Sequence, residues 1–140
     1  MFKKGFVALL LSVLLAVMVG TTAFAEEAVI TPEIAQALSE VEQVNAEIYG
    51  EIAKGQVLAD QLYEEYLLAV NEAGETAQLK ADYEKKLTKI ISEVDVKTQE
   101  ITRHGVEKAR ESGLNVEIEW IPVQFADRIA LIDPIRVVSW

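Results

Sequence analysis

The sequence predicts a mainly α fold of the α+β class, in which a long, coiled-coil-like antiparallel helical hairpin precedes a C-terminal β-hairpin. Apolar residues recur with three-four spacing along two long stretches on either side of Gly74. After Gly113 the spacing of apolar residues changes to two, which is typical of a half-buried strand. We expect a signal peptide over residues 1–25, a lead over 26–31, the helical hairpin over 32–113 and the β-hairpin over 114–140.

The first 25 residues have the order of a secretory signal peptide. Lys3 and Lys4 precede an apolar run over residues 6–20, and Ala23-Phe24-Ala25 forms an A-x-A cleavage site. The alternative is a membrane anchor, but the run is shorter than the roughly 20 residues that a spanning helix needs. We therefore expect an exported protein, secreted or periplasmic, without stable membrane insertion after cleavage. Because the chain has no cysteine, a lipid anchor on that residue is excluded.

The composition excludes several classes of partner. The chain holds 13 basic and 23 acidic residues, and removal of Lys3 and Lys4 with the signal peptide leaves a net charge of −12. Such a charge repels phosphate backbones and anionic lipids, so we expect neither nucleic acid nor a membrane surface as a partner. Without disulfides, the fold depends on the burial of apolar side chains.

The two helices have clear start and stop signals. Thr31-Pro32-Glu33 offers a hydroxyl cap, a proline at the first helical position and a carboxylate near the positive end of the helix dipole. The helical pattern continues to about Glu72. A second pattern runs over residues 76–112, where Gly113 can adopt the left-handed cap conformation.

The register between the helices follows from their apolar seams. Pairing positions whose numbers sum to 149 matches both seams and centres the turn next to Gly74. This register places Tyr66 against Tyr83. It also places the only histidine, His104, against Asn45, as a polar layer that would fix the register.

The apolar stripe of the first helix is much wider than that of the second. A two-stranded seam needs only a narrow stripe, so the extra width indicates burial against another element. The C-terminal segment, a second copy of the chain or a client protein could cover it. The side chains that we expect at an interaction surface come from this stripe and from the β-hairpin: Val44, Leu58, Tyr63, Leu67, Trp120 and Ile135.

The C-terminal β-hairpin is predicted from two β-rich runs, residues 116–120 and 129–138, with a turn over residues 126–128. A register summing to 255 places Trp120 opposite Ile135 and Glu119 opposite Arg136. One apolar face should then dock on the first helix, at the open end of the helical hairpin. That face consists of Ile118, Trp120, Ile135 and Val137, and the docking site of Ile34, Leu38 and Val41.

An alternative for the β-hairpin is that it stays free and captures a partner strand at its edge. Both alternatives make the C-terminal segment the part of the chain where we expect function to concentrate.

The residues that carry chemistry in enzymes are scarce. The chain has no cysteine and one histidine, and it contains neither an H-E-x-x-H nor a G-x-S-x-G motif. We therefore expect no enzyme, no cofactor and no metal site. We expect a small exported interaction or structural protein of the cell envelope or secreted space, which binds another protein or itself. The alternative is a chaperone-like holdase that binds exported clients along the apolar face of the first helix.

Overall fold

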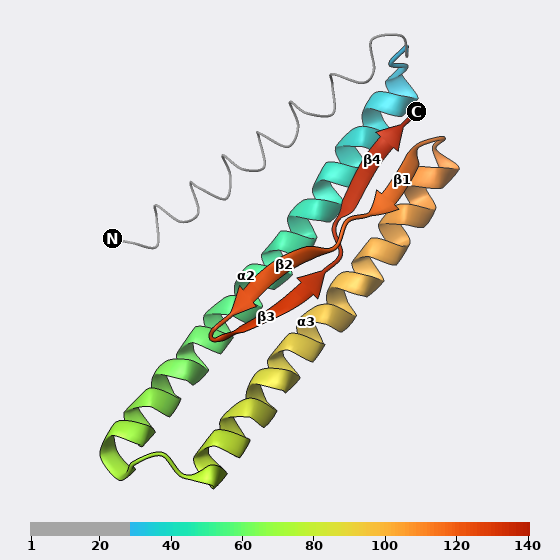
Figure 1. The fold of residues 1–140 in the computed structure, drawn as a ribbon. Helices are drawn as coiled ribbons and strands as arrows, with labels where there is room; N and C mark the ends of the chain where they lie inside the picture. Colours follow the sequence, from blue (N-terminus) through green and yellow to red (C-terminus); the bar gives the residue numbers. More distant parts are fainter. Residues whose placement is uncertain (1–28) are drawn as a thin grey trace, which may run out of the picture.

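The computed structural model describes residues 29–140, so the predicted signal peptide lies outside the described residues. Helix α2 spans Pro32–Ala73 and helix α3 spans Ala77–Glu111, and the two pack side by side in antiparallel orientation (Figure 1). Four strands follow: β1 Asn115–Ile118, β2 Ile121–Phe125, β3 Arg128–Ile132 and β4 Ile135–Ser139. The predicted fold class is confirmed.

The helix ends have the expected caps. The Thr31 hydroxyl accepts a hydrogen bond from the backbone N–H of Ile34 at 3.2 Å, with Pro32 as the first helical residue. At the start of α3, Thr76 accepts from the N–H of Leu79 at 3.1 Å. Gly113, with φ of 88°, turns the chain back along the helices.

The predicted register of the helical hairpin is confirmed. The rings of Tyr66 and Tyr83 stack with their centroids 4.5 Å apart. Gly55 faces Val94, and a methyl group at Gly55 would collide with the Val94 side chain. The glycine is needed there because the helix backbone approaches α3 so closely.

The predicted polar layer between Asn45 and His104 is wrong. His104 is exposed, whereas Asn45 hydrogen-bonds the main chain of Ile135. The reason is that β4 passes over this part of α2. At this point Ile135 presents its backbone N–H and its carbonyl to α2. The Asn45 amide can bind both groups, because its oxygen accepts from the N–H and its NH₂ donates to the carbonyl.

The strands form one long hairpin that is interrupted midway; we call residues 115–139 the ribbon. β1 pairs with β4, and β2 pairs with β3 through a two-residue turn at Ala126 and Asp127. Apart from Asn115 and Ser139, which lie beyond a register shift, the pairs sum to 253, so the predicted register is wrong by two positions. The turn begins at Ala126, with φ of 53°, as predicted, but it ends at Asp127, one residue earlier than predicted, so Arg128 already pairs with Phe125.

The ribbon crosses over itself at its interruption. β1 packs on α3, but β2, which continues it, packs on α2. In the returning half of the hairpin, β3 packs on α3 and β4 packs on α2 (Figure 1). The side-chain alternation shifts by one residue at this crossover. Val116 is buried before it, and Val123 and Phe125 are buried after it.

This shift makes the predicted docking of Trp120 wrong. The prediction treated residues 116–120 as one regular strand, whose even-numbered residues would all face the helices. Because the alternation changes at the crossover, Trp120 is 53% exposed, and Ile118 at the end of β1 is 44% exposed.

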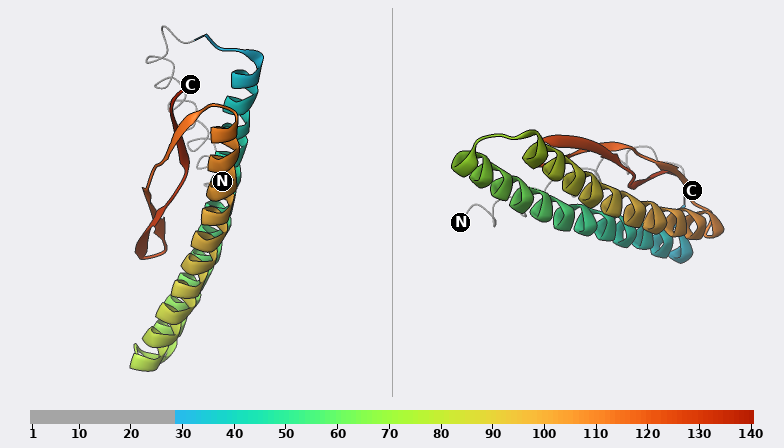
Figure 2. Two further views of the ribbon diagram at one scale, coloured as in Figure 1. Left: turned by 90° about the vertical axis from the view of Figure 1, so that its right-hand side faces the viewer. Right: turned by 90° about the horizontal axis from the view of Figure 1, so that it is seen from below.

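The ribbon nevertheless docks at the predicted end of the helical hairpin. Val116 and Ile135 are buried in one cluster with side chains of both helices, including Val41 of α2 and Val106 of α3, and Ile34 and Leu38 are partly buried around them. A second cluster, further along the helices, buries Phe125 and Ile132 of the ribbon. Its helical members are Ile48, Ile52, Ala59, Tyr83, Leu87 and Val94. The ribbon thus lies on one side of the helix pair, as Figure 2 shows, and covers much of the wide apolar stripe of α2.

Candidate functional site

The candidate site is the side of the β2–β3 hairpin that faces away from the helices. Cross-strand pairs place Leu131 beside Pro122 and Ile129 beside Gln124. Ile129 is 67% exposed and Leu131 is 57% exposed. The residues that alternate with them along β3 are half-buried (Arg128 and Ala130) or buried (Ile132). Trp120, two residues before Pro122, extends this surface at the crossover. We call these five residues the outer face.

Side chains from both helices hold the crossover in place. The Thr102 hydroxyl of α3 donates to the Asp133 carbonyl at 2.6 Å. From α2, the Asn45 amide donates to the Ile135 carbonyl and accepts from the Ile135 N–H, each at 2.8 Å. Within the ribbon, the Glu119 N–H donates to the Pro134 carbonyl at 2.8 Å.

The turn end of the ribbon is fixed in the same way. Gln56 of α2 donates to the Gln124 carbonyl at 3.0 Å, and Arg128 donates to the Thr88 hydroxyl of α3 at 2.6 Å. The hydroxyl of Tyr83 hydrogen-bonds the carboxylate of Asp127. The outer face is therefore presented on a support that is attached at both ends, which lowers the conformational entropy lost when a partner binds.

The outer face differs from the rest of the surface in its charge. None of its five residues is charged, whereas residues 33–72 of α2 carry nine acidic residues and one basic residue. Near the other end of the ribbon, Glu117 and Arg136 pair with each other at 2.8 Å. The most exposed apolar side chains of the ribbon thus coincide with its least charged region.

One buried carboxyl group lies under the crossover. Asp133 is only 2% exposed, and its Oδ1 has no hydrogen-bond partner. Burial raises the pKa of Asp133 above its ordinary value, and the nearby Asp95 carboxylate raises it further, whereas hydrogen bonds from the Asp133 backbone and the Thr98 hydroxyl oppose these effects. We therefore expect the stability of the attached ribbon to depend on pH.

Three tyrosines pack at the turn of the ribbon. Tyr63 lies 5.8 Å from Tyr83 and 6.5 Å from Tyr66, measured between ring centroids. The Tyr66 hydroxyl donates to Glu75 at 3.0 Å. Burial, followed by the hydrogen bond to Asp127, raises the pKa of Tyr83 above its usual range. The rings pack on one another, which indicates a structural cluster.

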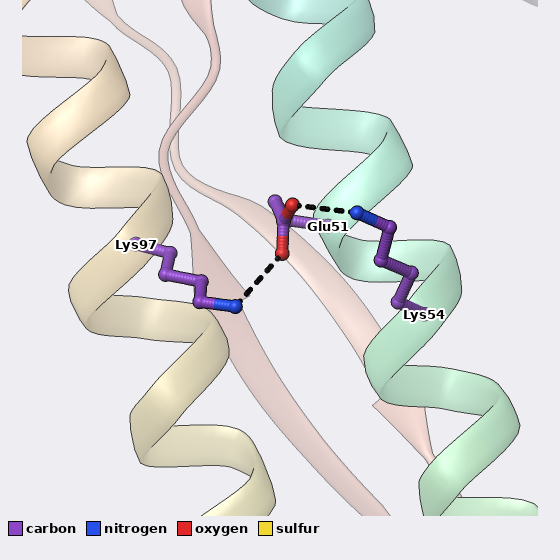
Figure 3. Close-up of polar contacts among 3 residues, drawn as sticks. All are labelled: Glu51, Lys54 and Lys97. Carbon is purple, nitrogen blue, oxygen red and sulfur yellow. Dashed lines mark hydrogen bonds and ion pairs between the residues drawn. The ribbon is translucent and has the colours of Figure 1, made fainter.

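A shallow groove of about 370 Å³ lies between the helices. Its apolar lining comes from Val44, Ile101 and Gly105, and both of its lysines form ion pairs with carboxylates. Glu51 accepts from Lys54 at 3.0 Å and from Lys97 at 3.5 Å, with the strands passing behind (Figure 3). Lys108 pairs with Glu40 at 3.3 Å. The residues that line the groove are Val44, Glu47, Glu51, Lys97, Glu100, Ile101, His104, Gly105 and Lys108.

The groove has no sign of a ligand site. Both of its lysines are already paired with carboxylates, and the hydrogen bond from Lys54 lowers the pKa of Glu51. Within residues 29–140, no three histidine or carboxylate side chains lie close enough together to hold a metal ion.

The six residues expected at an interaction surface lie in different places. Val44 and the buried Ile135 pack on either side of Gly105, where a methyl group would lie 2.7 Å from each. Tyr63 belongs to the tyrosine cluster. Leu58 and Leu67 are exposed on α2, and Trp120 is exposed on the ribbon. Of the six, only Trp120 belongs to the outer face.

Ile129 and Leu131 were not among the residues that the sequence predicted for an interaction surface. In a strand, Ile129 and Leu131 must point to one side and Ala130 and Ile132 to the other. The sequence does not tell which of these two sides faces the helices. The crossover decides that question, and it depends on contacts with residues far away in the chain.

Comparisons with protein-family models, with curated proteins and with solved structures found no match to this chain. Neither α2 nor α3, the helices of the described part of the chain, is long and apolar enough to cross a membrane.

Proposed function

We propose that this protein is a small exported, non-enzymatic interaction protein whose contact surface is the outer face of the ribbon. The observation that carries the proposal is the exposure of Ile129, Leu131 and Trp120, each more than half accessible, on one rigidly attached and uncharged surface. Contiguous apolar patches of this kind are typical of protein contact sites. Tryptophan and branched aliphatic side chains can bury a large area against a partner.

Export is supported by the order of residues 1–25, with a basic start, an apolar run and an A-x-A site. The test is the intact mass of the chain recovered from cells. A mature chain that begins at Glu26 supports export, and a chain that keeps Met1 or Phe2 in the cytoplasm contradicts it.

A holdase that binds clients along α2 is the second candidate. Ile48, Ile52 and Ala59 of that helix are buried by the ribbon and α3. The apolar side chains that stay exposed on α2 are two neighbouring pairs, Val57 with Leu58 and Leu67 with Leu68. This geometry favours one defined contact surface over a long client-binding stripe. A mature chain that suppresses the aggregation of an unfolded enzyme at equimolar ratio would favour the holdase.

The contact surface is tested with two matched double variants of the full chain. One variant combines Ile129→Ser with Leu131→Ser. The control combines Val57→Ser with Leu68→Ser, which are 53% and 62% exposed on α2. The size of the native complex in the extracytoplasmic fraction should fall for the ribbon variant and stay unchanged for the control. Equal behaviour of the two variants would contradict the proposal.

A further inference from the structure

We infer that the outer face binds a second copy of this chain, with the two ribbons stacked face to face about a two-fold axis. This inference rests on the proposed function, because it names the partner of the same surface. It follows from the distribution of charge and from the arrangement of the five residues along the ribbon.

The charge distribution disfavours α2 as the surface through which two copies approach each other. The mature chain carries a net charge of −12, and α2 alone contributes nine acidic residues against one lysine. Copies that meet through their α2 helices bring these like charges together. Copies that meet through their ribbons place both helix pairs on the far sides, because the ribbon covers one side of each pair (Figure 2).

The distances decide in favour of the ribbon-to-ribbon arrangement. Stacked sheets lie about 10 Å apart, and each helix pair is a further layer away. The Debye length at physiological ionic strength is about 8 Å, so repulsion between the two helix pairs is largely screened in this arrangement. A contact between two α2 helices would have no such screening.

The outer face is also self-complementary. Along the ribbon it begins at the turn with Ile129, continues with the pair of Leu131 and Pro122, and ends at the crossover with Trp120. A two-fold axis near Leu131 lays the Trp120 ring of each copy over Ile129 of the other. An aromatic side chain then covers the most exposed aliphatic side chain of the outer face, Ile129, which is 67% accessible in the single chain, and it does so twice in the same interface.

Other partners fit the outer face less well. A cationic protein would find its counter-charges on α2, since the outer face has none. A partner strand cannot extend the sheet at the outer edge of β2, because Pro122 lacks an N–H and the Gln124 carbonyl already accepts from Gln56.

The test is sedimentation equilibrium of the mature chain, residues 26–140, with Leu131→Glu as the variant and Leu68→Glu as the control. We expect a dimer whose dissociation constant rises at least about 30-fold in Leu131→Glu and is unchanged in Leu68→Glu. In a Trp140→Phe background, Trp120 fluorescence should shift to the blue with protein concentration. Circular dichroism of each variant checks that it remains folded.

The outcomes separate the inference from the proposed function. A mature chain that stays monomeric at millimolar concentration, while the native complex in cells still depends on Ile129 and Leu131, overturns the inference and leaves the proposed function standing. A dimer that Leu131→Glu does not weaken overturns the inference as well. If neither the dimer nor the native complex responds to changes in the outer face, both fail.

Discussion

The side chain of Asn45 pairs with the main chain of Ile135 through two hydrogen bonds of 2.8 Å, one donated and one accepted. The two residues are 90 positions apart in the chain. This contact fixes β4 on α2 at the point where the ribbon crosses over. It therefore determines which side of the ribbon faces the helices and which side remains exposed.

Replacement of Asn45 by leucine should destabilise the protein by roughly 2 kcal/mol or more, because it leaves a partly buried N–H and carbonyl of Ile135 without partners. Asn71→Leu, at an exposed position of the same helix, is the control and should change stability little. Urea unfolding followed by circular dichroism measures both. Equal stability of the two variants would mean that Asn45 does not hold the ribbon.

Two glycines of the helices should respond differently to replacement by alanine. At Gly105 a methyl group would lie 2.7 Å from Ile135 Cδ1 and 2.7 Å from Val44 Cγ1, whereas at Gly50 it would meet nothing within 4 Å. Both changes gain about 1 kcal/mol of helix propensity, but only Gly105→Ala introduces overpacking, which costs about 1–3 kcal/mol. Thermal unfolding should show Gly50→Ala to be more stable than the natural chain and Gly105→Ala to be the less stable of the two.

The buried Asp133 should make stability depend on pH. Because burial raises its pKa in the folded state, the folded chain binds this proton more tightly than the unfolded chain does. The stabilising contribution is complete below the ordinary pKa of an aspartate, about 3.9, and is lost as pH rises through the raised pKa of the folded state.

Asp133→Asn tests this dependence, since it removes the ionisable group and keeps the shape. The free energy of unfolding of the variant, minus that of the natural chain, should increase as pH rises from about 4 and then level off. Asp60→Asn, at an exposed position of α2, serves as the control for nonspecific effects of charge. A difference that does not vary with pH would show that Asp133 ionises as freely in the folded chain as in the unfolded one.

The fold of the helical hairpin could be predicted because its signals are local or periodic. Thr31, Thr76 and Gly74 mark helix ends through their own side chains or backbone. The stacking of Tyr66 on Tyr83 follows from a seam that repeats over many turns, so one error in position does not change the register.

The ribbon could be predicted only in part, because its geometry depends on single contacts. The place of its docking was correct, since Gly113 returns the chain to the open end of the helices. The strand register was off by two because nothing in the sequence distinguishes a turn that ends at Asp127 from one that ends at Arg128. The exposure of Trp120 depends on the crossover, which Asn45 and Thr102 fix from distant parts of the chain.

The measurement that tests the central claim most directly is photo-cross-linking in intact cells, with a photoreactive amino acid at position 131 or at position 68 of the full chain. Leu131 and Leu68 are similarly exposed, at 57% and 62%, but only Leu131 belongs to the outer face. We expect a discrete cross-linked product, either a dimer or a complex with another protein, from position 131 and none from position 68. Products from position 68 alone, or equal products from both positions, would contradict the assignment of the outer face as the contact surface.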